Sequence, residues 1–174
     1  MAKINFRFRR SLLILTLIVA FFGARWWYFR PSVHQGTVAP PIIGDSADGR
    51  IFSLDQFKDE YVYLNFWGSW CGPCLAKIPE INQLRGDLPP DQLRIVHVAV
   101  EDDSLRWRST LNRLQIPGDA HLIDLSTSLR FFNGPIVSDY GIKEVPSAFL
   151  LAPGNKIVAH NPSMDKIRRI TTER

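Results

Sequence analysis

The most constraining feature of this 174-residue chain is the sequence WCGPC at positions 70–74, directly after a run of apolar residues at 61–67. The run is typical of a buried strand, and a helix is predicted to begin at the cysteines. Backbone N–H groups in a first helical turn lack partners and carry partial positive charge. Both effects favour the thiolate form of Cys71, which is the reactive form. The spacing also places Cys74 within bonding range, so the segment predicts thiol–disulfide exchange.

Other interpretations of the cysteine pair are weaker. The chain has two cysteines in all, and its four histidines are scattered without ligand spacing, so no metal site is expected. We expect the histidines to be surface residues or satisfied core residues. A purely structural disulfide would close a loop of two intervening residues, which gains little stability. No organic cofactor is expected, because a Cys71–Cys74 disulfide can carry the electrons itself.

Positive charge is concentrated in residues 1–30. They hold six of the 21 lysines and arginines and no acidic residue, which leaves 15 basic residues against 17 acidic ones in the remainder. The remainder is therefore slightly acidic and has no basic stripe. Nucleic acid is not expected as a partner.

The apolar run that follows the basic segment predicts a membrane anchor. Residues 12–29 are 18 in number, or about 27 Å of helix at 1.5 Å per residue, close to the apolar thickness of a bilayer. Arg25 can extend to the interface, where the aromatic cluster at 26–29 is also favourable. Phe22 fits the −3 position of a cleavage site poorly, so an uncleaved signal anchor is favoured over a cleaved signal peptide.

The position of the charges predicts the orientation. Positive residues on the N-terminal side of the run favour a cytoplasmic N-terminus and an extracytoplasmic domain. We therefore expect a single-pass protein of the inner membrane that contacts lipid through residues 11–29, with a periplasmic domain where disulfides persist. The predicted organisation is a basic segment and anchor at 1–30, a proline-containing tether at 31–41 and one domain at 42–174.

The pattern after the tether alternates strands and helices. Strands are predicted at 42–43, 50–53, 61–67, 93–100, 120–124, 147–151 and 156–159. Helices are predicted at 54–57, 71–85 with a kink at Pro79, 103–114, 127–132, 136–140 and 164–170. The sequence PGN at 153–155 is a strong hairpin signal. This order predicts an α/β fold with a mixed central sheet and flanking helices.

Four motifs support a family resemblance. They are residues 39–41 with 49–54, residues 65–74 followed by Pro79, residues 145–146, and residues 153–157. On these motifs, residues 36–170 resemble the thioredoxin superfamily, and within it the membrane-anchored TlpA/ResA group of thiol–disulfide oxidoreductases. The resemblance implies a thioredoxin-like fold with a cis bond before a proline in the third motif. It also implies that this proline loop lies beside the cysteines and pairs with substrate backbone. The substrate-binding residues expected from it are Trp70, Gly72, Pro73, Val145 and Pro146.

Three further residues are candidate modulators of the pair. Thioredoxins carry a buried acid, which accepts a proton near the second cysteine, where this chain has Asn65; asparagine is usual there in the TlpA/ResA group. ResA-type proteins that reduce apocytochrome c carry an acidic residue where this chain has Lys77. An ammonium group one turn after Cys74 favours thiolate, unless Lys77 simply belongs to a solvated helix face. Glu101, at the end of a predicted strand, is a candidate proton relay.

The expected function is a membrane-tethered oxidoreductase that exchanges disulfides with extracytoplasmic proteins. The Gly-Pro pair between the cysteines resembles that of reducing thioredoxins, so reduction is favoured, and a membrane electron donor is then an expected partner. A role in cytochrome c maturation stays open. The alternatives are the oxidase or isomerase direction and a non-catalytic binding module. A peroxidase of the peroxiredoxin type would carry Thr or Ser three residues before the attacking cysteine, where this chain has Gly68.

Overall fold

The computed structural model describes residues 6–28, 33–126 and 132–173, and the chain divides into two compact units, residues 1–31 and 32–174. Unit 1 contains the helix α1 (Phe6–Tyr28). Every side chain described in α1, from 12 to 25, is exposed. Among the residues whose side chains the structure describes, no helix is both long enough and apolar enough to cross a membrane. The anchor at residues 11–29 stays a prediction.

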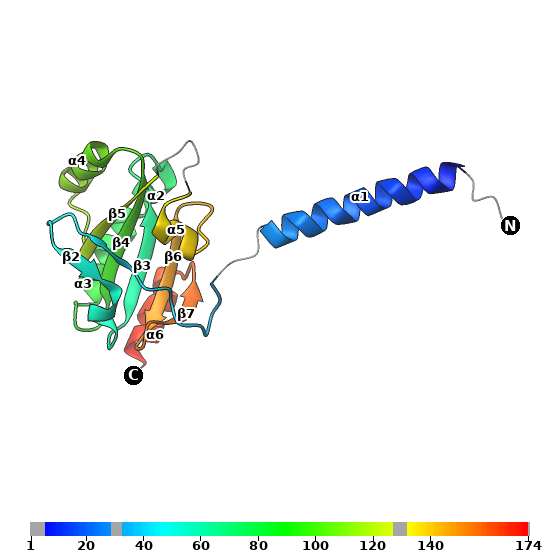
Figure 1. The fold of residues 1–174 in the computed structure, drawn as a ribbon. Coiled ribbons are helices and arrows are strands. Elements are labelled where there is room, and N and C mark those ends of the chain that lie inside the picture. The colour runs from blue at the N-terminus through cyan, green and yellow to red at the C-terminus, as the bar shows by residue number, and fades with distance from the viewer. Residues whose placement is uncertain (1–5, 29–32, 127–131, 174) are drawn as a thin grey trace. The chain divides into compact units, whose positions relative to one another are not determined.

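Unit 2 is built on a five-stranded mixed sheet with the strand order β5-β4-β3-β6-β7 (Figure 1). The three parallel strands are β3 (Val62–Trp67), β4 (Arg94–Glu101) and β5 (Ala120–Leu125). β6 (Ser147–Ala152) runs antiparallel to β3, and β7 (Lys156–His160) closes a hairpin with β6. A separate antiparallel pair is formed by β1 (Ile43–Asp45) and β2 (Ile51–Ser53). The predicted mixed sheet and its hairpin are confirmed.

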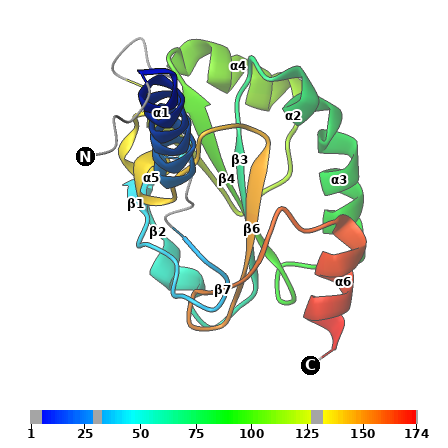
Figure 2. The same cartoon turned by 90° about the vertical axis from the view of Figure 1, so that its right-hand side faces the viewer.

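Helices cover both faces of this sheet (Figure 2). One face packs against α3 (Ile78–Asp87), α4 (Ser104–Leu114) and α6 (Met164–Thr172). The other face packs against α5 (Pro135–Asp139), the β1–β2 hairpin and the 3-10 helix η1 (Leu54–Phe57). Of the helices predicted, the one at 127–132 falls mainly on residues 127–131, which lie outside the described part of the chain.

The central strand β3 is buried on both faces, which explains its continuous apolar sequence. Val62, Leu64 and Phe66 point into the core on the α5 side. Tyr63 and Trp67 point into the core on the α3 side, because successive side chains of a strand alternate between faces. The cysteines belong to the α3-side core, so β3 delivers the active-site loop onto the face covered by α3, α4 and α6.

The helix predicted at 71–85 is two helices in the structure. The first, α2 (Gly72–Ala76), ends before Lys77, and α3 follows with Pro79 in its first turn. Pro79 has no N–H to donate to the carbonyl of Leu75, so one helix cannot run through this point without a break. The predicted kink is confirmed and is sharp enough to divide the helix.

The predicted tether at 31–41 is wrong for its described part, residues 33–41. Val33 and Ala39 are buried in the α5-side core. The N–H of Ala39 donates to the carbonyl of Asn155 at 2.8 Å, and Gly36 donates to Ile157 at 2.7 Å. Main-chain hydrogen bonds to β7 therefore fix these residues as part of unit 2. The proline content of the segment suggested an extended chain but gave no sign of this pairing.

Candidate active site

The two cysteines form a disulfide at the start of α2, with their Cα atoms 5.2 Å apart. Cys71 is the N-cap of α2, and its Sγ accepts a hydrogen bond from the backbone N–H of Cys74 at 3.2 Å. A helix N-terminus places unpaired N–H groups and partial positive charge at this sulfur, as predicted. On reduction, the same N–H can stabilise a Cys71 thiolate.

Cys71 is more buried than the sequence suggested, with 4% of its surface exposed. The carbonyl oxygen of Val145 lies 3.7 Å from its Sγ. Cys74 is 2% exposed and packs in the α3-side core. In the oxidised state, little of either cysteine is therefore accessible to a partner.

The Val145–Pro146 peptide bond is cis, as the resemblance implied. Both residues are half-buried. Ser147, which follows them, pairs with Phe66 of β3, so this loop lies at the same end of the sheet as the cysteines. Pairing between β3 and β6 thus brings together two segments that are about 75 residues apart in sequence.

Trp70 presents an indole that is both exposed and held in place. Its side chain is 42% exposed, and its Nε1–H donates to the carbonyl of Val100 at 2.9 Å. A Cβ atom at Gly68 would lie 2.7 Å from the indole, so the ring packs directly on the glycine backbone. Gly72 and Pro73 are exposed in the first turn of α2. The predicted substrate-binding residues therefore surround the disulfide.

Asn65 takes no part in an acidic pair. Its Nδ2 lies 3.0 Å from Nδ1 of His97, and Nε2 of His97 lies 2.9 Å from the carbonyl oxygen of Pro117. Burial lowers the pKa of His97 from 6.5 to about 3, and the neighbouring His121 acts in the same direction. The neutral ring therefore donates through Nε2 to Pro117 and accepts from Asn65, which confirms His97 as a satisfied core residue.

Glu101, predicted as a proton relay, is fully buried under the loop that leads to Cys71. Its Oε1 accepts the backbone N–H of Ser69, and its Oε2 accepts from Nη2 of Arg106 at 3.2 Å. Arg106 also donates through Nε to the hydroxyl of Ser69 at 3.1 Å. No role was predicted for Arg106 or Ser69 from the sequence; the signal present there was a basic residue one turn after the predicted helix start.

Lys77 is exposed at the junction of α2 and α3. It lies one turn after Cys74, on the solvent side. The structure thus places it on the solvated helix face that was one of the two interpretations. The influence of its charge on thiolate formation at the cysteines is tested by the Lys77→Glu variant in the Discussion.

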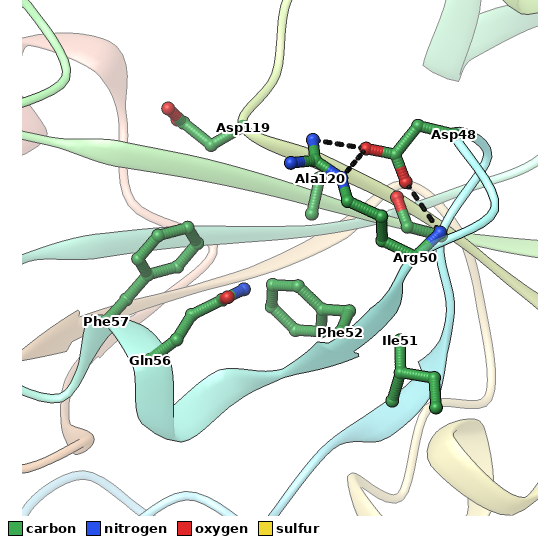
Figure 3. A pocket seen from close by; sticks show the side chains of 9 residues that line it. Asp48, Arg50, Ile51, Phe52, Gln56, Phe57, Asp119 and Ala120 are labelled. Carbon is green, nitrogen blue, oxygen red and sulfur yellow. Dashed lines mark hydrogen bonds and ion pairs between the residues drawn. The ribbon is translucent and has the colours of Figure 1, made fainter.

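A pocket of about 260 Å³ lies elsewhere, between the β1–β2 hairpin, η1 and the start of β5 (Figure 3). An ion pair between Asp48 and Arg50 lies at its rim. Asp119 and Phe57 line it from two other elements. None of the predicted site residues lines this pocket, so it is separate from the disulfide.

Comparisons with known proteins agree with this geometry. A model of the AhpC/TSA family matches residues 35–160. Thiol-disulfide oxidoreductase ResA of Bacillus thuringiensis subsp. konkukian is 24% identical over 160 residues, which cover 91% of this chain and 88% of that protein. The thioredoxin domain of a thiol-disulfide oxidoreductase from Bacteroides vulgatus has a TM-score of 0.68 and 23% identity, over 79% of this chain and 95% of that one. A thiol:disulfide interchange protein from Bacteroides sp. has a TM-score of 0.68 and 24% identity, over 82% of this chain and 91% of that one. The predicted thioredoxin-like fold and the resemblance to ResA-type proteins are confirmed.

Proposed function

This chain belongs to the AhpC/TSA family, and from that membership and the Cys71–Cys74 bond we infer that it is a thiol–disulfide oxidoreductase acting on proteins. One observation carries the inference: a two-cysteine disulfide caps a helix N-terminus beside the Val145–Pro146 loop. This arrangement combines a stabilised thiolate, a resolving thiol and an adjacent strand start where a substrate backbone can pair. The ResA-type relatives are also named thiol-disulfide oxidoreductases.

We propose that the chain works as a reductase. The Cys71 thiolate attacks one sulfur of a substrate disulfide, a mixed disulfide forms, and the other substrate sulfur leaves as a thiolate that takes a proton. Cys74, as thiolate, then attacks Sγ of Cys71. The second substrate sulfur leaves, and Cys71–Cys74 closes. Two electrons pass to the substrate, and no organic cofactor is needed because the sulfur pair carries them.

Turnover in this direction needs a source of electrons. The closed Cys71–Cys74 bond must be reduced again after each cycle, and in an oxidising compartment the glutathione pool does not supply this. We propose a membrane dithiol protein as the donor. The Gly72-Pro73 pair supports reduction, since thioredoxins are poised near about −270 mV and strong oxidants near about −120 mV.

We also propose that the N-terminal segment tethers the domain to the inner membrane, with the domain in the periplasm. The support is the sequence of residues 12–29 together with the four basic residues before it, Arg25 within it and Arg30 directly after it. A tether would keep the cysteine pair close to a membrane donor and raise its effective concentration. The check is fractionation of the full chain: alkaline carbonate extraction leaves an anchored protein in the membrane pellet and releases a peripheral or cleaved one.

The experiment for the main proposal is substrate trapping. In a Cys74→Ser variant of the full chain, the mixed disulfide on Cys71 cannot be resolved, so the substrate stays covalently bound and can be identified by mass spectrometry after acid quench. The Cys71→Ser/Cys74→Ser double variant is the matched control. Adducts that form equally in both would contradict the proposal, and a chain that keeps its function without either cysteine would be the binding module instead.

Direction and substrate class have their own tests. A reduction potential above roughly −150 mV would overturn the reductase direction. We propose apocytochrome c as one substrate, on the resemblance of the sequence to the TlpA/ResA group, and its presence among the trapped adducts would support a role in cytochrome c maturation. The peroxidase alternative is disfavoured by Gly68, because any β-carbon there would meet the Trp70 ring.

A further inference from the structure

The end of β4 holds the loop that leads into Cys71 at two successive residues. Val100 accepts the indole N–H of Trp70 at 2.9 Å, and the side chain of Glu101 accepts the backbone N–H of Ser69. From α4, Arg106 bonds both the Ser69 hydroxyl and the Glu101 carboxylate. The two residues before Cys71 are therefore each fixed by a separate hydrogen bond to the same strand end.

We propose that Glu101 and Arg106 are positioning residues for disulfide exchange. They fix the Ser69–Trp70 segment, and so they set where the Trp70 indole stands when a protein disulfide approaches Cys71. This rests on the proposed function, because it names the residues that prepare the same site for a polypeptide substrate.

Burial supports a specific role for the carboxylate. Glu101 is 0% exposed, and a buried carboxylate is costly unless charged and hydrogen-bonding partners surround it. Here both oxygens have partners, Ser69 on one and Arg106 on the other. Because such pairs are a poor source of stability, their value lies in fixing one geometry.

The same contacts argue against a proton relay. A relay that acts directly needs an oxygen within hydrogen-bond reach of the group that it serves. Among the described residues, the hydrogen bonds of the Glu101 carboxylate run to Ser69 and Arg106, and none runs to Cys71 or Cys74. We therefore assign the Glu101 carboxylate the role of fixing the Ser69–Trp70 segment before Cys71.

A fixed indole benefits binding. Trp70 is 42% exposed, yet it cannot turn freely, because Val100 holds its N–H and Gly68 lies under its ring. A platform that is already in place loses little conformational entropy when a substrate packs on it. This saving in entropy is greater for a polypeptide substrate, which packs on the indole, than for a small disulfide, which contacts only the sulfur of Cys71.

The test compares Glu101→Gln with Asp119→Asn in the full chain. Asp119 is a matched control, because its carboxylate also accepts a backbone N–H, from Ile95 at 2.7 Å, and also pairs with arginines, Arg85 and Arg94. It lies at the opposite end of β4, about 20 Å of strand away at 3.3 Å per residue. Both substitutions remove a charge and keep the side-chain size. Arg106→Lys is a second variant, which keeps the charge but loses the guanidinium group that contacts Ser69, Glu101 and Asp102 together.

The measurement is the single-turnover rate constant of the reduced protein with insulin and with the small disulfide DTNB, normalised to the folded fraction. Glu101→Gln and Arg106→Lys should lower the insulin rate by about tenfold, the factor for one charge-assisted hydrogen bond, and leave the DTNB rate within about twofold. Asp119→Asn should leave both rates unchanged.

Two results would overturn the proposal. Equal losses with insulin and DTNB would mean that Glu101 acts on thiol ionisation. An insulin rate no lower than that of Asp119→Asn would mean that Glu101 has a purely structural role. A wild-type chain that fails to reduce insulin would instead contradict the proposed function.

Discussion

The side-chain amide of Asn65 lies 3.0 Å from Nδ1 of His97, and the two residues are direct neighbours across the parallel pair β3 and β4. The ring is anchored on its other side by the carbonyl of Pro117. A neutral polar pair therefore occupies the place where thioredoxins carry a buried acid. Both ring nitrogens of His97 have a partner, and the pair is neutral, so it places no charge on the face of the sheet that carries the cysteines.

The first prediction concerns stability at acid pH. The pKa of His97 is lowered by burial from 6.5 to about 3, so between these values the unfolded chain binds a proton that the folded chain does not. The contribution of His97 to the free energy of unfolding is therefore complete above pH 6.5 and is lost as the pH falls toward 3. The slope from this residue is at most about 1.4 kcal/mol per pH unit. Urea titrations at a series of pH values measure the slope.

Two variants isolate the contribution of His97. His97→Asn keeps an acceptor near the position of Nδ1 but cannot be protonated, so its stability should depend less steeply on pH between 6.5 and 3 even if its absolute stability is lower. His34→Asn, at an exposed position, is the control for the loss of a histidine that is not buried. Some slope should persist in His97→Asn, because burial also lowers the pKa of His121. Identical slopes for wild type and His97→Asn would show that His97 is not buried in its neutral form.

The second prediction tests the packing of Trp70 on Gly68. In Gly68→Ala, the new Cβ would lie 2.7 Å from Cε2 and Nε1 of the indole, so the ring must move and its bond to Val100 must break. We expect a loss of about 1–3 kcal/mol in the free energy of unfolding, as for overpacked sites, and slower reduction of insulin.

Gly86→Ala is the control for this substitution. Gly86 lies in α3 with no heavy atom within 4 Å of a built Cβ, so alanine should stabilise the protein by about 0.4–1 kcal/mol and leave the insulin rate unchanged. If Gly68→Ala were as stable and as active as Gly86→Ala, the indole would not be held where the structure places it.

Local sequence was sufficient for the cysteine site. The strand before Cys71, the helix start and the two-residue spacing are all properties of one short segment, and the structure confirms each of them. The hairpin at Gly154-Asn155 was predictable for the same reason, since the turn residues themselves carry the signal.

Long-range contacts were not predictable in this way. The pairing of Asn65 with His97 depends on the register of β3 and β4, which periodicity does not give. The contact of Glu101 with Ser69 joins residues 32 positions apart. The docking of residues 33–41 on β7 requires main-chain partners that no side-chain pattern reveals. In each case the missing information was tertiary.

The third prediction concerns the β6–β7 turn. Asn155 has a φ of 54° and follows Gly154 with a φ of 80°, and its Nδ2 donates to the carboxylate of Asp55 at 2.9 Å. A β-branched residue is strained at positive φ, so Asn155→Val should lower the free energy of unfolding by about 1–3 kcal/mol. Asn155→Gly removes the same hydrogen bond without strain and should lose less. Urea denaturation measures both, and equal losses would mean that strain contributes nothing.

The last prediction concerns Lys77 and the thiols of the reduced protein. Lys77 is exposed one turn after Cys74, so its charge favours thiolate through a screened, solvent-side interaction. Lys77→Glu should slow iodoacetamide labelling at pH 7 by about twofold at low salt, and the difference should shrink in 1 M salt as screening increases. Lys58→Glu makes the same charge change at an exposed position before β3, at the opposite end of that strand, and should leave the rate unchanged.

The same substitution has a defined effect on redox poise. Destabilising the thiolate destabilises the reduced pair, so Lys77→Glu should make the Cys71–Cys74 couple more reducing, by about 10 mV for a twofold change in the equilibrium constant. An acidic residue at this position would therefore favour electron donation more than Lys77 does. Equilibration with glutathione at several redox ratios measures the potential. An unchanged potential together with an unchanged labelling rate would mean that Lys77 belongs only to the solvated face of the helix and does not tune the cysteines.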